Sequence, residues 1–132
     1  MLSDIVRAIN DILKDTFGIA EGLADRNRVT VLDFATGTGT FLIEVLERIF
    51  EEIGGAGSAK APLVVRDHIL KNIYGFEYLI APYTIAHLKL SQYLRDKELE
   101  AKRTDEKGLP SGEFGPHVRE RFQVFLGFSQ AS

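Results

Sequence analysis

The stretch DFATGTGTF, residues 33–41, separates two apolar segments and decides how the chain is organised. The preceding VTVLDFA, residues 29–35, is short, apolar and β-branched, as buried strands are. The following FLIEVLERIFEEI, residues 41–53, carries a wide apolar stripe at helical spacing, with acidic residues on the far side. A glycine-rich turn from strand to helix lets backbone N–H groups and the positive end of the helix approach a ligand. The sequence therefore predicts a binding loop at residues 33–41.

Composition excludes several classes of function. The chain has 132 residues, a formal net charge of -3 and no cysteine. One domain of ordinary globular composition fits this length, and the charge gives no electrostatic footprint for nucleic acid. Without cysteine there are no disulfides, thiolate nucleophiles or cysteine-type zinc sites. Met1 leads directly into an amphipathic pattern, and no apolar run approaches the length of a membrane span. We expect a cytoplasmic protein without a metal site.

The remaining segments alternate between helix and strand patterns. The segment from residue 2 to 19 predicts a helix with Ile5, Ile9, Ile12 and Leu13 on one face. Helix, strand, helix and strand are then predicted at residues 63–72, 73–77, 81–102 and 121–128. The helix at 81–102 is expected to bury Ile85, Leu88, Leu90, Tyr93 and Leu94. This order is typical of an α/β protein with a parallel sheet.

Three classes of ligand use a glycine loop of this kind. A phosphate-binding P-loop needs a lysine after its last glycine, but Thr40 and Phe41 follow Gly39. The dinucleotide fingerprint needs a third glycine where Leu42 stands, which makes NAD a weak candidate. The third class is a nucleoside with an amino-acid tail, whose ammonium group an acid at the strand end meets directly or through water. Asp33 occupies that position.

DFATGTGTFL resembles motif I of the S-adenosylmethionine-dependent N6-adenine DNA methyltransferases, particularly those of Type I and single-chain restriction–modification enzymes. The matching positions are Asp33, Ala35, Thr36, Gly37, Thr38, Gly39, Phe41 and Leu42. Phe34 departs from the usual proline, which changes how the chain enters the loop. YGFEYLIAPYTIAHLKL, residues 74–90, resembles the second motif of the same family at Gly75, Glu77, Ala81, Ala86 and Leu88. Residues 5–19 resemble the helix that precedes motif I.

The residues of the second motif agree with this resemblance. Glu77 ends a predicted strand, where a carboxylate accepts hydrogen bonds from the two ribose hydroxyls of an adenosine. Tyr78 follows, in a position to lie against the adenine ring. The alternative for Glu77 is that it caps the next helix, because acids favour helix N-termini.

The resemblance implies an α/β, partial Rossmann-like fold of three parallel strands in the order 3-2-1, with flanking helices. Residues 1–132 would form a partial methyltransferase domain, with an N-terminal helix and connection at 1–27 and the cofactor-binding half at 28–132. The implied cofactor is S-adenosyl-L-methionine. Its implied contacts are Asp33, Ala35, Thr36, Gly37, Thr38, Gly39, Phe41, Glu77 and Tyr78.

Methyl transfer itself requires more than these motifs. The Asn-Pro-Pro-Tyr-type motif that holds a flipped adenine does not occur in the sequence. We therefore expect a longer parent enzyme that binds duplex DNA through other parts, and no catalytic residue in this chain. Two alternatives stay open: a methyltransferase acting on RNA, protein or a small molecule, and a non-catalytic nucleotide-binding or interaction module. We also expect a homodimer formed through the exposed edge of the strand at VTVLDF, which has no proline or lysine to block pairing.

Overall fold

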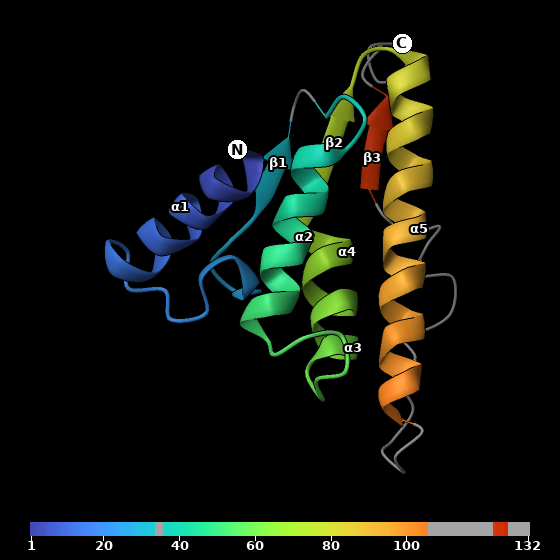
Figure 1. Ribbon diagram of the computed structural model, residues 1–132. Helices are drawn as coiled ribbons and strands as arrows, with labels where there is room; N and C mark the ends of the chain where they lie inside the picture. The colour runs from blue at the N-terminus through green and yellow to red at the C-terminus, as the bar shows by residue number, and fades with distance from the viewer. Residues whose placement is uncertain (34–35, 106–122, 127–132) are drawn as a thin grey trace.

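The computed structural model describes residues 1–33, 36–105 and 123–126 (Figure 1). Its long helices are α1 (Leu2–Asp15), α2 (Thr40–Glu52) and α5 (Ile80–Asp105). Shorter helical pieces are a 3-10 turn (Gly22–Ala24), α3 (Ala61–Val64), a π-helical segment (Val65–Ile69) and α4 (Leu70–Asn72). The strands are β1 (Val31–Asp33), β2 (Ile73–Glu77) and β3 (Gln123–Leu126).

The strands form a short parallel ladder in which β2 lies between β1 and β3. Asp33 at the end of β1 is in register with Gly75, and Glu77 at the end of β2 is in register with Leu126. The carboxyl ends of the strands therefore meet at one edge, at the top of Figure 1. The helices α2 and α5 also begin at this edge, so the ladder brings the two sequence motifs together.

The expected partial Rossmann-like α/β fold is wrong as a description of this structure. Helices dominate the described residues, since α1, α2 and α5 have 14, 13 and 26 residues. The strands have only three, five and four residues. The strand predicted at residues 73–77 is all in the ladder, whereas of the segment at 29–35 only Val31–Asp33 are. The corrected class is a mostly helical chain around a short parallel ladder.

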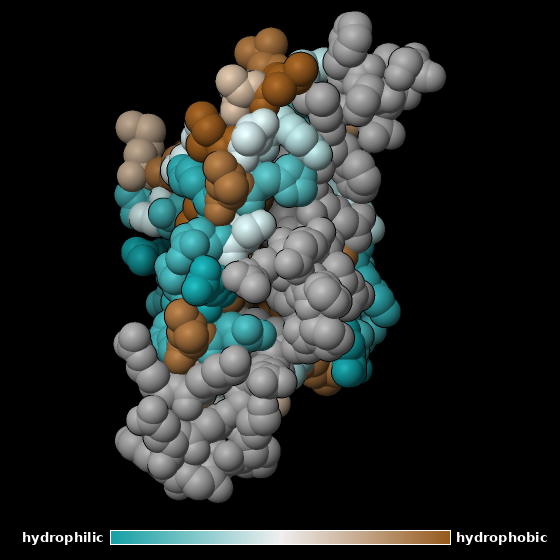
Figure 2. All heavy atoms as spheres, turned by 90° about the vertical axis from the view of Figure 1, so that its right-hand side faces the viewer, coloured by the Kyte–Doolittle hydropathy of each residue, from teal (hydrophilic) through white to brown (hydrophobic). Residues whose placement is uncertain are grey.

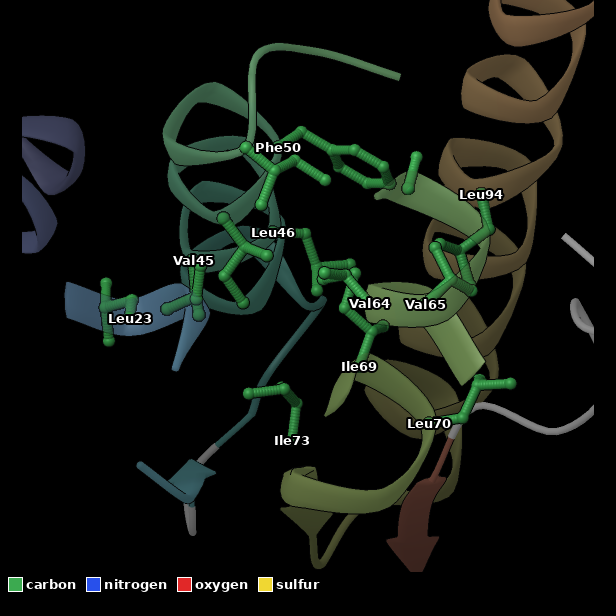
Figure 3. Packing of buried hydrophobic residues seen from close by; sticks show 14 of the residues in the cluster. Leu23, Val45, Leu46, Phe50, Val64, Val65, Ile69, Leu70, Ile73 and Leu94 are labelled. Carbon is green, nitrogen blue, oxygen red and sulfur yellow. The ribbon is translucent and has the colours of Figure 1, made fainter. Parts of the chain in front are cut away.

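The hydrophobic core lies between α2 and the segment from α3 to β2 (Figure 3). The stripe predicted on α2 is buried at Leu42, Leu46, Ile49 and Phe50. Figure 3 shows Leu46 and Phe50 directed toward Val64, Val65 and Ile69, with Leu94 of α5 on the far side. The wide stripe of α2 therefore faces this segment and α5.

On α5 the buried face differs from the predicted one. Leu90 and Leu94 are buried as expected, but Ile85 and Leu88 are 44% and 67% exposed. The helix instead buries Ala86, where its side chain allows Gly39 to come close. Tight backbone approach therefore sets the rotation of α5, and the larger apolar residues beside Ala86 point outward.

On α1 a polar residue chooses the buried face. Asn10 is buried, its Oδ1 accepts from Leu23 N–H at 2.9 Å, and its Nδ2 donates to Glu52 at 2.9 Å. With Asn10 and Val6 turned inward, the face that carries the isoleucines stays exposed. The hydrogen bonds of Asn10 thus set the rotation of α1, whereas the apolar pattern alone predicts that the isoleucine face is buried.

His68 is completely buried in the π-helical segment. Its Nε2 lies 2.6 Å from the Leu23 carbonyl oxygen, and its Nδ1 lies 3.0 Å from Asn72 Nδ2. An amide donor on Nδ1 fixes the neutral tautomer with the proton on Nε2. Burial lowers the pKa of His68, which is its largest perturbation. The imidazole therefore joins the first turn after α1 to the segment before β2.

Candidate functional site

The glycine loop connects β1 to α2 at the carboxyl edge of the ladder. Gly37 and Gly39 have φ angles of +57° and +87°, a region that residues with side chains rarely adopt. A Cβ on Gly39 would lie 3.4 Å from both Cα and Cβ of Ala86. Gly39 therefore serves the packing of the loop on α5. At Gly37 a Cβ would meet nothing within 4 Å, so this part of the loop faces open space.

Thr36 attaches the loop to β2. Its side chain is only 4% exposed, and its Oγ1 donates to the Asp33 carbonyl oxygen at 2.9 Å and accepts from Phe76 N–H at 2.7 Å. The Thr36 N–H in turn donates to the Phe76 carbonyl oxygen at 3.0 Å. Through these three hydrogen bonds, the side chain and the backbone N–H of Thr36 continue the pairing of β1 with β2. Thr36 is thus a structural member of the loop, with its hydroxyl fully used inside the protein.

Glu77 completes the junction between the two motifs. Its Oε1 accepts from Gly37 N–H at 2.8 Å, and its Oε2 accepts from Leu79 N–H at 2.9 Å. The residue is 9% exposed, and it lies 40 positions from Gly37 in the sequence. Glu77 therefore ends β2 and accepts from an N–H group just before α5, which begins at Ile80.

The electrostatics of Glu77 follow from these donors. The pKa of its carboxyl group is below the usual value, first because Leu79 N–H donates to it and then because Gly37 N–H does. Desolvation opposes this shift and is outweighed. An ionised carboxylate has about four lone-pair sites; Leu79 and Gly37 N–H use two of them, and Tyr78 N–H also donates to the carboxylate. The acceptor site that these donors leave can accept a hydrogen bond from a hydroxyl group of a ligand.

An exposed apolar rim borders this carboxylate. Tyr78, Leu79 and Ile80 are 65%, 63% and 70% exposed at the turn between β2 and α5. The Tyr78 ring packs edge-on against Phe76, with centroids 5.5 Å apart, so its orientation is supported from below. Figure 2 shows hydrophobic side chains gathered at the upper end of the molecule, where this turn lies in Figure 1.

The other predicted contact residues divide into three groups. Asp33 and Thr38 lie at the same edge, Asp33 half-buried at the end of β1 and Thr38 exposed in the loop. Phe41 packs against the hydrophobic core from the first turn of α2. Ala35 falls outside the described residues. The loop, Glu77 and Tyr78 are therefore brought together, whereas Phe41 supports the loop from the core side.

Two groups at the site were missed by sequence reasoning. Lys89 Nζ donates to Thr40 Oγ1 at 3.3 Å and places a cation beside the start of α2. Leu79 N–H is the second donor to Glu77. Nothing in the sequence around Lys89 distinguishes it from an ordinary surface lysine. The Leu79 donor lies outside the usual capping pattern, because α5 begins at Ile80 and Glu77 stands two positions before the N-cap residue.

Among residues 1–33, 36–105 and 123–126, no cluster of histidine, aspartate and glutamate has the arrangement to hold a metal ion. No helix within the same ranges has the length and apolar character needed to cross a membrane.

Comparison with known proteins finds similarity among solved structures. No protein-family model matches the sequence, and no curated protein matches it either. Among solved structures, an ATP-dependent Type ISP restriction–modification enzyme, LlaBIII, bound to DNA, matches 96% of this chain with a TM-score of 0.63 and 25% sequence identity. The match covers 7% of that enzyme's chain. The chain is thus similar, over nearly its whole length, to a small part of a restriction–modification enzyme.

Proposed function

We propose that this chain is the S-adenosylmethionine-binding part of a DNA adenine-N6 methyltransferase that serves restriction–modification, with residues 28–132 as the binding part. The single observation that carries the proposal is the hydrogen bond between Glu77 and Gly37. It joins the acid of the second motif to the glycine loop of the first, so a nucleoside and its tail can meet both.

The residues present fit this cofactor. Open space lies in front of Gly37, and the ionised Glu77 retains an acceptor site for a ribose hydroxyl. Tyr78 offers an exposed ring next to that carboxylate, and Asp33 places a second acid at the other side of the loop. When bound, S-adenosylmethionine supplies an electrophilic methyl group. The chain's own contribution is to bind and orient the nucleoside through Glu77, Gly37 and Tyr78.

The choice of DNA adenine as substrate rests on two supports. One is the match of both motifs to the N6-adenine family in the same order. The other is the similarity to a restriction–modification enzyme that was solved bound to DNA. We expect no methyl transfer by this chain alone, because it has no Asn-Pro-Pro-Tyr-type motif. Tritium transfer from labelled S-adenosylmethionine to duplex DNA by the purified chain would contradict this assignment of roles.

Calorimetric titration with S-adenosylhomocysteine, S-adenosylmethionine and NAD tests the binding step. We expect weak binding of the two adenosyl compounds and none of NAD. The Glu77→Gln variant keeps the shape of the side chain but has one acceptor oxygen in place of two. Because hydrogen bonds to a charged group contribute about 1.5–3 kcal/mol, its affinity should fall roughly 10-fold or more.

The matched control is Glu51→Gln, which makes the same chemical change at an exposed position of α2. Its affinity should stay within about twofold of the unchanged chain, because a distant surface charge is screened. Preference for NAD would refute the cofactor assignment. Equal affinity of the Glu77→Gln variant and the unchanged chain would refute the site.

A further inference from the structure

The exposed face of α1 is a continuous apolar stripe. Leu2, Ile5, Ile9 and Ile12 are 37%, 45%, 38% and 50% exposed, and Phe17 just beyond the helix is 61% exposed. Their spacing of three or four residues places them along one side of the helix. The buried residues of α1, Val6 and Asn10, point in a different direction. The helix therefore has a second apolar face, which the described part of the chain leaves exposed.

The position of α1 leaves this face accessible. The helix contacts α2 and the 3-10 turn on one side. In Figure 1 it lies at the margin of the molecule, away from α5. Taking roughly 180 Å² for a fully exposed side chain of this size, the stripe presents on the order of 400 Å². That is as large as the largest apolar patch of many monomers, and such patches mark interaction sites.

We propose that the stripe on α1 is the contact surface between two copies of this chain, packed as an antiparallel pair of α1 helices. The midpoint of the stripe lies between Ile5 and Ile12, close to Ile9. Rotation about a two-fold axis at this midpoint places Ile5 against Ile12 of the second copy, and Ile9 beside its own counterpart. An isologous contact needs such self-complementary spacing.

Charge also favours the antiparallel pair. Asp4 is exposed in the first turn of α1. At the opposite end, Arg28 donates to the Phe17 carbonyl oxygen at 3.4 Å, which places a guanidinium beside the end of the stripe. Antiparallel packing brings Asp4 of one copy toward Arg28 of the other, at both ends. The helix dipoles are opposed in the same arrangement.

The area places the pair among weak complexes. Two stripes and their polar borders bury on the order of 1,000 Å² in total, the lower limit for a specific interface. Interfaces at this limit are typically weak, so association is measured from roughly 10 µM upward. The proposal is independent of the proposed function, because none of its residues belongs to the glycine loop or Glu77.

Light scattering during size-exclusion chromatography, from 10 to 500 µM, tests the pair on the full chain. The Ile9→Lys variant should weaken association at least about 10-fold, because each copy buries a charge at the centre. The control is Asp11→Asn, which raises the charge by the same amount at an exposed position away from the stripe and should leave association unchanged. Circular dichroism verifies that both variants are folded.

A second measurement uses the absence of cysteine from the chain. The Ile9→Cys variant should form a covalent dimer on mild oxidation, since its two sulfur atoms meet near the two-fold axis, whereas Asp11→Cys should not. A monomer at every concentration would overturn the proposal. So would a dimer that persists in Ile9→Lys, because that pair uses another surface, such as the free edge of β1.

Discussion

Replacing Thr36 with valine should destabilise the fold by about 2–4 kcal/mol although the two side chains have nearly the same shape. The substitution removes only the hydroxyl group that lies between the glycine loop and β2. That hydroxyl donates to the Asp33 carbonyl oxygen and accepts from Phe76 N–H. The side chain is 4% exposed, so water does not replace both partners.

The magnitude follows from the two groups left behind. Phe76 N–H loses its acceptor, and an unsatisfied donor in a partly buried position costs about 1–3 kcal/mol. The Asp33 carbonyl oxygen loses one donor, which contributes about 1 kcal/mol. The matched variant Thr36→Ser keeps the hydroxyl and loses one methyl group, at a cost of about 1 kcal/mol. The valine variant should therefore be clearly less stable than the serine variant.

Urea unfolding followed by far-ultraviolet circular dichroism measures both variants against the unchanged chain. For the valine variant the midpoint should fall by roughly 1 M or more, with an unchanged slope. Because domains of this size are stable by only about 5–15 kcal/mol, the effect is easily resolved. A loss below 1 kcal/mol for valine, or equal losses for valine and serine, would show that the hydroxyl does not hold the loop.

Two further substitutions test the polar contacts beneath α1 and before β2. Gly22→Ala should cost about 2–4 kcal/mol, because its Cβ would overlap the buried Asn10 carboxamide at a φ of +56°. The control Gly18→Ala, with φ +68° and no atom within 4 Å, should cost only about 1 kcal/mol, and equal costs in urea unfolding would contradict the overlap. His68 has a lowered pKa, so its neutral form stabilises the fold above the ordinary imidazole value. Stability should fall by up to about 1.4 kcal/mol per pH unit below pH 6.5, until the folded pKa is reached. The His68→Gln variant should lose this dependence between pH 5 and 7, and an unchanged slope would show that another group titrates.

Hydrophobic periodicity predicted the elements that bury a full apolar stripe. The strand expected at residues 73–77 is confirmed as β2, and the helix expected at 41–53 is confirmed as α2. On α2 the apolar residues form one wide stripe, and this stripe is the buried face of the helix. The position of the glycine loop was also predictable from the sequence, because the loop directly follows the apolar segment that forms β1.

Periodicity failed where a small or polar residue decides the packing. The helix α5 buries Ala86 so that Gly39 can approach, which turns Ile85 and Leu88 outward. In α1 the two hydrogen bonds of Asn10 fix the rotation of the helix. The expected α/β class failed for a related reason, since the length of a ladder depends on long-range pairing. No local pattern shows how many residues of an apolar segment will pair.

The candidate site also depends on long-range hydrogen bonds, those of Thr36 and Glu77. Substitutions of these two residues should differ in their effects on stability and on ligand affinity. Thr36 has all its hydrogen-bonding groups occupied inside the protein, so its removal affects the fold first and the site second. Glu77 lies at the edge of the ladder, where its carboxylate accepts from the main-chain N–H groups of Gly37, Leu79 and Tyr78 and has an acceptor site left for a ligand. Its conversion to glutamine leaves one acceptor oxygen for those donors and removes the charge that a ligand would meet. If threonine holds the loop and glutamate holds the ligand, Glu77→Gln should affect ligand affinity more than stability. Thr36→Val should affect stability more than ligand affinity. Equal effects of each substitution on both quantities would mean that the junction only holds the loop against β2.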